Sequence, residues 1–215
     1  MKHLDQKKGF FAALIVCSII ISIAPPVRAA TFINGSFESP GVITEVDLSA
    51  SPGFVTGWTN SGAEYYEGAG NSHGWSAQDG TFGISFGHNG GIGGVLMQTF
   101  DTSIGANYTV SFFVTRIQGG VSAQSVTAQA LNATTSANLG TTLTAIPVAN
   151  AVWTAGNSLN FTATSTSTTL KFIDSTAAGG DSNWALDHVT VVPEPSCLLL
   201  LASASLLCFR RKMRL

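Results

Sequence analysis

The segment EYYEGAGNSHGWSAQDG, residues 64 to 80, holds the side chains best suited to contact a sugar. Sugar sites combine an aromatic surface for the apolar face of the ring with fixed polar groups for its hydroxyls. The candidate sugar-binding residues are Tyr65, Tyr66, His73, Trp75 and Asp79. The alternative is that Trp75 and one of the tyrosines close the end of a β-sandwich and contact no ligand.

Side chains with the spacing of a catalytic site are scarce. Glu64 and Glu67 are candidates for the paired carboxylates of a glycoside hydrolase, but a spacing of three in a loop indicates nothing about their separation across a glycosidic bond. Their ordinary interpretation is as solvated acids. His73, His88 and His188 show no spacing typical of zinc ligands. We therefore predict that the protein is not an enzyme, with a glycan-active hydrolase as the less favoured alternative.

The charge of the central region excludes one class of partner. Between residues 30 and 192 the cations are Arg116 and Lys171, against ten acidic residues, which leaves a formal charge of minus eight. A region of that sign repels phosphate backbones, so we predict no nucleic-acid partner. The three cysteines all lie in the apolar end segments, which excludes an internal disulfide or thiolate metal site in the central region.

The two ends of the chain indicate export. Residues 1–29 begin with lysines, continue with an apolar stretch from Phe10 to Ile23 and end in small residues at Ala29, the order of a secretory signal peptide cut by signal peptidase. At the other end, 13 uncharged and mostly apolar residues run from Cys197 to Phe209, shorter than a comfortable membrane span. The basic residues after them place the central region outside the inner membrane.

The elements that must position the candidate residues are short strands. In NYTVSFFVT, residues 107 to 115, apolar side chains alternate with the other positions in a period of two, and similar runs recur between glycine-containing turns. The pattern predicts one all-β domain over residues 30–192, an antiparallel β-sandwich or jelly roll. A signal-peptide helix is expected before it and a short hydrophobic helix after it.

The C-terminal tail, residues 193–215, resembles a PEP-CTERM sorting signal. The resemblance rests on Pro193, Glu194 and Pro195, then the apolar run, then Arg210, Arg211 and Lys212. It implies transient residence in the inner membrane of a Gram-negative bacterium and cleavage by an exosortase. It also implies delivery to the cell surface or to extracellular polysaccharide. The alternative is a C-terminal anchor that is never cut.

The central domain resembles the galactose-binding-like jelly rolls found in carbohydrate-binding modules. The resembling pieces, in chain order, are Asn34-Gly35-Ser36-Phe37-Glu38, Gly57-Trp58, Asp79-Gly80, Gln98-Thr99-Phe100, Gly105-Ala106-Asn107-Tyr108-Thr109-Val110-Ser111-Phe112 and Ala185-Leu186-Asp187-His188-Val189. The resemblance implies a structural calcium ion, with Glu38 and Asp187 at the matching positions. The alternative is that Asp187 marks the fraying end of the core, where it faces water or caps a turn.

These features together predict a function. We expect an exported, non-enzymatic β-sandwich that associates with extracellular polysaccharide or the cell surface, with sugar recognition as its candidate activity. The alternative is a structural or adhesive matrix protein with no specific ligand.

Overall fold

The computed structural model describes residues 32–41, 45–62, 64–68, 71, 73–87, 91–117, 124–148, 150–177 and 183–195. These residues form eleven strands and no helix, which confirms the predicted all-β fold. No helix among them has the length and apolar character needed to span a bilayer. The expected signal peptide, C-terminal helix and basic cluster Arg210, Arg211 and Lys212 lie outside the described residues.

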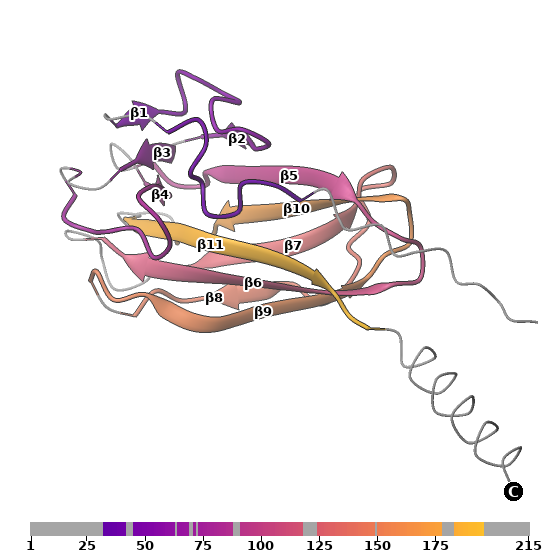
Figure 1. Ribbon diagram of the computed structural model, residues 1–215. Helices are drawn as coiled ribbons and strands as arrows, with labels where there is room; N and C mark the ends of the chain where they lie inside the picture. Colours follow the sequence, from indigo (N-terminus) through magenta and orange to yellow (C-terminus); the bar gives the residue numbers. More distant parts are fainter. Residues whose placement is uncertain are drawn as a thin grey trace, which may run out of the picture.

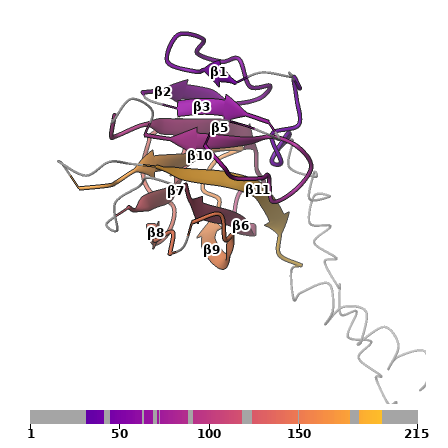
Figure 2. The ribbon, with the colours of Figure 1, turned by 90° about the vertical axis from the view of Figure 1, so that its left-hand side faces the viewer.

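The strands form two antiparallel sheets, here called sheet A and sheet B. Sheet A has the order β1 (Val46–Asp47), β3 (Glu64–Glu67), β4 (Gly83–Phe86), β11 (Trp184–Pro193), β6 (Asn107–Arg116), β9 (Thr154–Thr162). Sheet B has the order β2 (Thr59–Ser61), β5 (Val95–Asp101), β10 (Ser167–Asp174), β7 (Val126–Asn132), β8 (Leu143–Ala145). The short strands β1 to β4 gather at one end of the molecule (Figures 1 and 2). The edge strands of sheet A are β1 and β9, and those of sheet B are β2 and β8.

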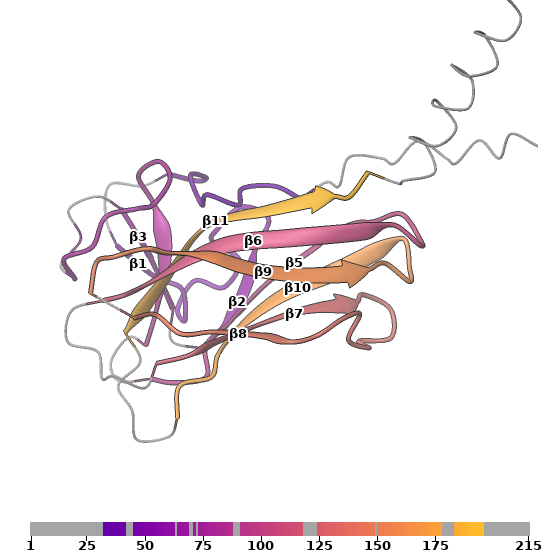
Figure 3. The ribbon, with the colours of Figure 1, turned by 90° about the horizontal axis from the view of Figure 1, so that it is seen from below.

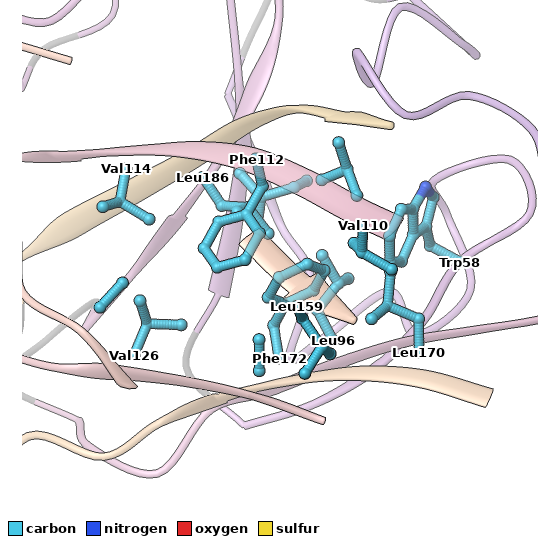
Figure 4. Close-up of a cluster of buried hydrophobic side chains, with 14 of the residues drawn as sticks. Trp58, Leu96, Val110, Phe112, Val114, Val126, Leu159, Leu170, Phe172 and Leu186 are labelled. Atoms are coloured by element: carbon cyan, nitrogen blue, oxygen red, sulfur yellow. The ribbon is translucent and has the colours of Figure 1, made fainter. Parts of the chain in front are cut away.

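The two sheets pack face to face because alternate residues of their strands are apolar. In β10 and β7, buried and half-buried positions alternate along the whole strand. Figure 3 shows β11 and β6 on one side of the sandwich and β10 and β7 on the other. Between them, Val110 and Phe112 of β6 point toward the side of β10 that carries Leu170 and Phe172 (Figure 4). Val114 of β6 lies opposite Val126 of β7. Burying this apolar area is the main force that holds the sheets together.

The predicted domain boundary falls within one residue of the end of the last strand. β11 continues to Pro193, which pairs with Tyr108 of β6. The backbone N–H of Glu194 donates to the carbonyl of Asn107 at 2.8 Å, and Thr109 donates its hydroxyl to the Glu194 carboxylate at 2.9 Å. The first two residues of the Pro-Glu-Pro motif are therefore attached to the sandwich rather than separated from it.

Candidate functional site

The aromatic side chains of the segment 64–80 are buried. Tyr65 is 8% exposed, Tyr66 is 0% and Trp75 is 4%. Tyr66 stacks on Phe82 with ring centroids 5.0 Å apart and accepts a hydrogen bond from Gly41 N–H through its hydroxyl. Of the two interpretations that the sequence left open, the burial agrees with packing rather than with an exposed sugar platform. Asp79 is exposed and His73 half-buried.

Trp75 covers the outer face of sheet A. The residues beneath it are small: a methyl group added at Gly83 would lie within 3.0 Å of the Trp75 ring, and Ala185 belongs to the same cluster. Trp153 packs edge-on against Trp75 with centroids 5.8 Å apart and donates its ring N–H to the Ser76 carbonyl. The loop that carries the aromatic residues is thus fastened onto the sheet by two indole rings.

Glu67 lies under this cover, and each of its carboxylate oxygens accepts one hydrogen bond. It is 0% exposed, and Trp75 donates its indole N–H to Oε2 at 3.0 Å, while Ser85 donates its hydroxyl to Oε1. The Nδ1 atom of His73 lies 3.0 Å from the same Oε1. No Lys or Arg among the described residues forms an ion pair with Glu67. A buried carboxylate of this kind depends on its neutral donors and on whatever positive charge comes near it.

Glu64 is buried on the opposite side of the same strand. It is 0% exposed, and neither oxygen accepts a hydrogen bond of ordinary geometry from the described residues. Burial raises the pKa of Glu64 to about 7, and the nearby carboxylate of Asp174 adds to the rise, while the Val95 N–H and the Asn60 side chain oppose it. The expectation that Glu64 and Glu67 are solvated acids in a loop is therefore wrong. Three positions apart in β3, they also face opposite sides of the sheet.

The two candidate calcium ligands hold one loop. Asp187 is 0% exposed and accepts backbone hydrogen bonds from Gln78 at 2.7 Å and Asp79 at 2.9 Å through Oδ2, and from His188 through Oδ1. A register shift in β11 follows directly, and burial raises the pKa of Asp187 to about 7. Asp187 does not face water, so that part of the alternative is wrong. Its hydrogen bonds to the N–H groups of Gln78 and Asp79 agree with the other part, in which it caps a turn.

Glu38 binds the same loop two residues further on. Its Oε1 accepts from the N–H groups of Thr81 and Phe82, both at 2.8 Å. Its carboxylate lies against Gly80, whose φ of +74° suits glycine and where an added methyl group would collide with it. Both of these hydrogen bonds go to Oε1, and Glu38 Oε2 accepts no such backbone hydrogen bond from the described residues. Calcium binding at Glu38 and Asp187 stays a prediction.

The outer face of sheet B carries an open groove of about 670 Å³. Its floor consists of rows of side chains that pair across the strands: Lys171 lies between Met97 and Gln129, and Thr169 lies between Thr99 and Leu131. These are the outward positions of β5, β10 and β7, where half-buried or exposed residues alternate with buried ones. The sequence analysis missed this groove, because alternation shows which residues face outward but not which strands are neighbours.

Lys171 is the charged residue of the groove lining. Its side chain forms no hydrogen bond or ion pair with any described residue, whereas Arg116 donates from Nε to Asn150 at 2.7 Å. The remaining lining supplies hydroxyl and amide groups together with the apolar side chains of Met97 and Leu131. The groove can therefore offer hydrogen bonds and one positive charge to a polar ligand.

Solved structures share this fold at low sequence identity. A cyclase from Fischerella sp. TAU, in complex with 4-(1H-indol-3-yl)butan-2-one, aligns with a TM-score of 0.58 at 16% identity over 79% of this chain and 99% of its own. An arabinose-bound α-L-arabinofuranosidase aligns at 0.53 and 15% identity over 78% of this chain and 27% of its own. The module TmCBM61 in complex with β-1,4-galactotriose aligns at 0.49 and 12% identity, over 78% of this chain and 100% of its own.

The similarities with TM-scores above 0.5 agree with the β-sandwich architecture and show the fold alone. No curated protein matches the sequence. One family does match, and it covers residues 30–192, the full extent of the domain predicted from the strand pattern. The chain therefore belongs to the family DUF642, described as a protein of unknown function.

Proposed function

We propose that the protein is a non-catalytic carbohydrate-binding protein whose ligand lies in the groove on sheet B. The observation that carries the proposal is the groove itself: about 670 Å³ of open space over sheet B, lined by hydroxyl and amide groups together with apolar side chains and Lys171. Ligand sites commonly have volumes of about 300 to 1,000 Å³. A sheet face of this kind suits an extended chain better than a small molecule that must be enclosed.

The chemistry of the lining fits sugar hydroxyls. Thr99, Thr169 and Gln129 offer donors and acceptors at fixed cross-strand spacings, and Met97 and Leu131 offer apolar contact for a ring face. The arabinofuranosidase, of which 27% aligns with this chain, was solved with arabinose bound, so sugars are the first ligand class to test. A groove without aromatic lining predicts weak binding for each sugar unit, which many units along a polymer would compensate.

The ends of the chain support a location outside the cell. A signal peptide at 1–29 and the PEP-CTERM-like tail at 193–215 predict processing by signal peptidase and by an exosortase. Processing would leave the sandwich at the cell surface or in extracellular polysaccharide, where a shallow polysaccharide-binding groove is useful. Intact-mass analysis of protein from the native envelope and medium tests this step, because both cleavages shorten the chain by predictable masses.

Binding to a panel of immobilised polysaccharides tests the groove. The double variant Gln129→Leu/Thr169→Val removes polar groups from the floor and keeps the side-chain volume similar. We expect it to weaken binding at least about tenfold, the loss of a hydrogen bond or two. The matched control is Thr190→Val on β11 of sheet A, which should bind like the unaltered protein.

Two results would contradict the proposal. If the folded protein binds no polysaccharide at all, the alternative of a structural or adhesive matrix protein gains support. If it binds but the double variant binds equally well, the ligand lies elsewhere on the molecule. Release of shortened glycan products would instead favour the hydrolase alternative.

A further inference from the structure

We infer that Glu45, Glu67 and His73 form a binding site for a transition-metal dication such as Zn²⁺. Each of the three residues offers one ligand atom, and the three atoms all lie within 4.8 Å of one another. Glu45 precedes β1, Glu67 belongs to β3 and His73 lies in the loop after β3. The spacing of these residues along the sequence therefore does not predict the site. The site lies on the covered outer face of sheet A, and it is independent of the groove on sheet B.

The separations of the ligand atoms suit a shared ion. The Nδ1 atom of His73 lies 3.0 Å from Glu67 Oε1 and 3.8 Å from Glu45 Oε2. Zinc binds imidazole nitrogen and carboxylate oxygen at about 2.0 to 2.2 Å, so two ligands of one ion at ordinary angles lie about 3.0 to 3.6 Å apart. Small movements of the exposed residue Glu45 would complete the set.

The His73 ring nitrogen provides a second observation that points to a ligand. Nδ1 is a buried atom and makes no hydrogen bond of ordinary geometry with the described residues, although a carboxylate oxygen lies 3.0 Å away. The distance between Nδ1 and Oε1 suits two ligands of one ion. A cation bound by both atoms would satisfy the buried nitrogen that has no hydrogen bond.

The surroundings of the ligands hold them in place. Trp75 N–H and the Ser85 hydroxyl fix the Glu67 carboxylate, as outer partners commonly do around metal ligands. The side chain of Asn71 accepts from the His73 N–H at 3.0 Å and donates to the carbonyls of Gly68 and Trp75. This network closes the turn that carries His73, so the imidazole is presented to Glu67 by a defined loop.

Access and charge both favour a bound dication. The side chains of His73 and Glu45 are 34% and 30% exposed while Glu67 is 0% exposed, so an ion reaches the buried carboxylate from the solvent side and keeps room for water. Two carboxylates balance a charge of plus two. An imidazole ligand selects zinc and its neighbours over calcium, which prefers a shell of oxygen atoms only.

Calorimetric titration of the full, metal-stripped chain with Zn²⁺ tests the site. We expect one ion for each chain, and a drop in affinity of at least about tenfold in His73→Gln and in Glu45→Gln, because the loss of a mere supporting partner already costs about 10- to 100-fold. His188→Gln is the matched control, since it removes another described histidine that lies outside the set, and it should bind zinc like the unaltered protein.

The outcomes separate this site from the predicted calcium site. Titration with Ca²⁺ should give the same result for His73→Gln as for the unaltered chain, because His73 is no ligand for calcium. Circular dichroism shows that each variant is folded before its titration is interpreted. The inference is overturned if the unaltered chain binds no zinc, if His73→Gln binds zinc unchanged, or if His188→Gln abolishes binding instead.

Discussion

The outer face of sheet A is covered by a loop, whereas the outer face of sheet B is open. On sheet A, the loop carrying Trp75 covers the face and buries Glu67 and Asp187 beneath it, each held by fixed N–H or hydroxyl donors. On sheet B the face stays open, and its one charged groove residue, Lys171, has no partner among the described residues. One face is closed around anionic groups, and the other is left available to a ligand.

This difference predicts which face of the molecule contributes to stability and which face binds a ligand. A covered carboxylate has lost its water and depends on each donor, so changes on sheet A should affect stability. An outward side chain on sheet B keeps its solvent and supports little of the fold, so changes there should affect binding. The predictions below test that division, beginning with the largest effect on stability.

Replacing Asp187 with alanine should cost about 4 kcal/mol of unfolding free energy, because three backbone N–H groups lose their acceptor in a buried place, each at about 1 to 3 kcal/mol. Asp187→Asn, which keeps one acceptor oxygen, should lose less. Lys171→Ala on sheet B is the matched control and should stay within about 0.5 kcal/mol. Urea denaturation measures all three, and a loss below about 1 kcal/mol in Asp187→Ala would contradict the comparison.

Glu64 should make the protein less stable as pH rises. Its pKa is raised from 4.5 to about 7, so between these values the folded chain holds a proton that the unfolded chain releases. The contribution of Glu64 to the unfolding free energy is therefore full below about pH 4.5. It falls as the pH rises toward 7 and is constant above that. At about 1.4 kcal/mol for each pKa unit, the total loss is about 3 kcal/mol.

Glu64→Gln isolates this contribution, because the glutamine cannot titrate. The difference in stability between the two proteins should change with pH over that window, while the contribution of Asp187, which has the same sign, cancels between them. Denaturant midpoints from pH 4.5 to 8 give the measurement. If the midpoints of the two proteins change with pH in parallel, Glu64 does not keep its proton in the folded state over this range.

The strands and the class of fold were readable from the sequence, and the covered face was not. The period of two in residues 107–115 and 168–173 reports burial on one side of a strand, which is a local property. The burial of Trp75 depends on Gly83 and on Ala185, about a hundred residues further along the chain. A single sequence contains no signal for that contact, so Trp75 had the same pattern as an exposed sugar platform.

The acids show the same limit. Glu64 and Glu67 stand in a segment rich in glycine and polar residues, which predicted a solvated loop, yet tertiary contacts make it a buried strand. His73 showed no zinc-like spacing to another histidine, because its partners are carboxylates from β3 and from residue 45. The groove on sheet B likewise required the strand order, which places β10 between β5 and β7.

Trp75→Phe should separate packing from ligand contact. The phenylalanine keeps most of the aromatic cover but removes the N–H that donates to Glu67, a bond to a carboxylate worth about 1.5 to 3 kcal/mol. Thermal and urea unfolding should show a loss of about 2 kcal/mol, while polysaccharide binding stays unchanged. If Trp75→Phe instead loses polysaccharide binding and keeps its stability, Trp75 contacts the sugar directly.

Thr169→Val should give the smallest change in stability and the clearest separation of the two faces. The hydroxyls of Thr169 and Thr99 bond across the strands at 2.8 Å in an exposed pair, and such pairs are worth about 0.2 to 1 kcal/mol. Valine has the same shape and suits a strand, so we expect a loss of about 0.5 kcal/mol or less. Thr109→Val on sheet A is the matched control, since its hydroxyl also lies at an exposed place, within hydrogen-bond distance of Asn160 and Glu194. If Thr169→Val weakens polysaccharide binding and Thr109→Val does not, at equal stability, then the open face is the one that meets the ligand.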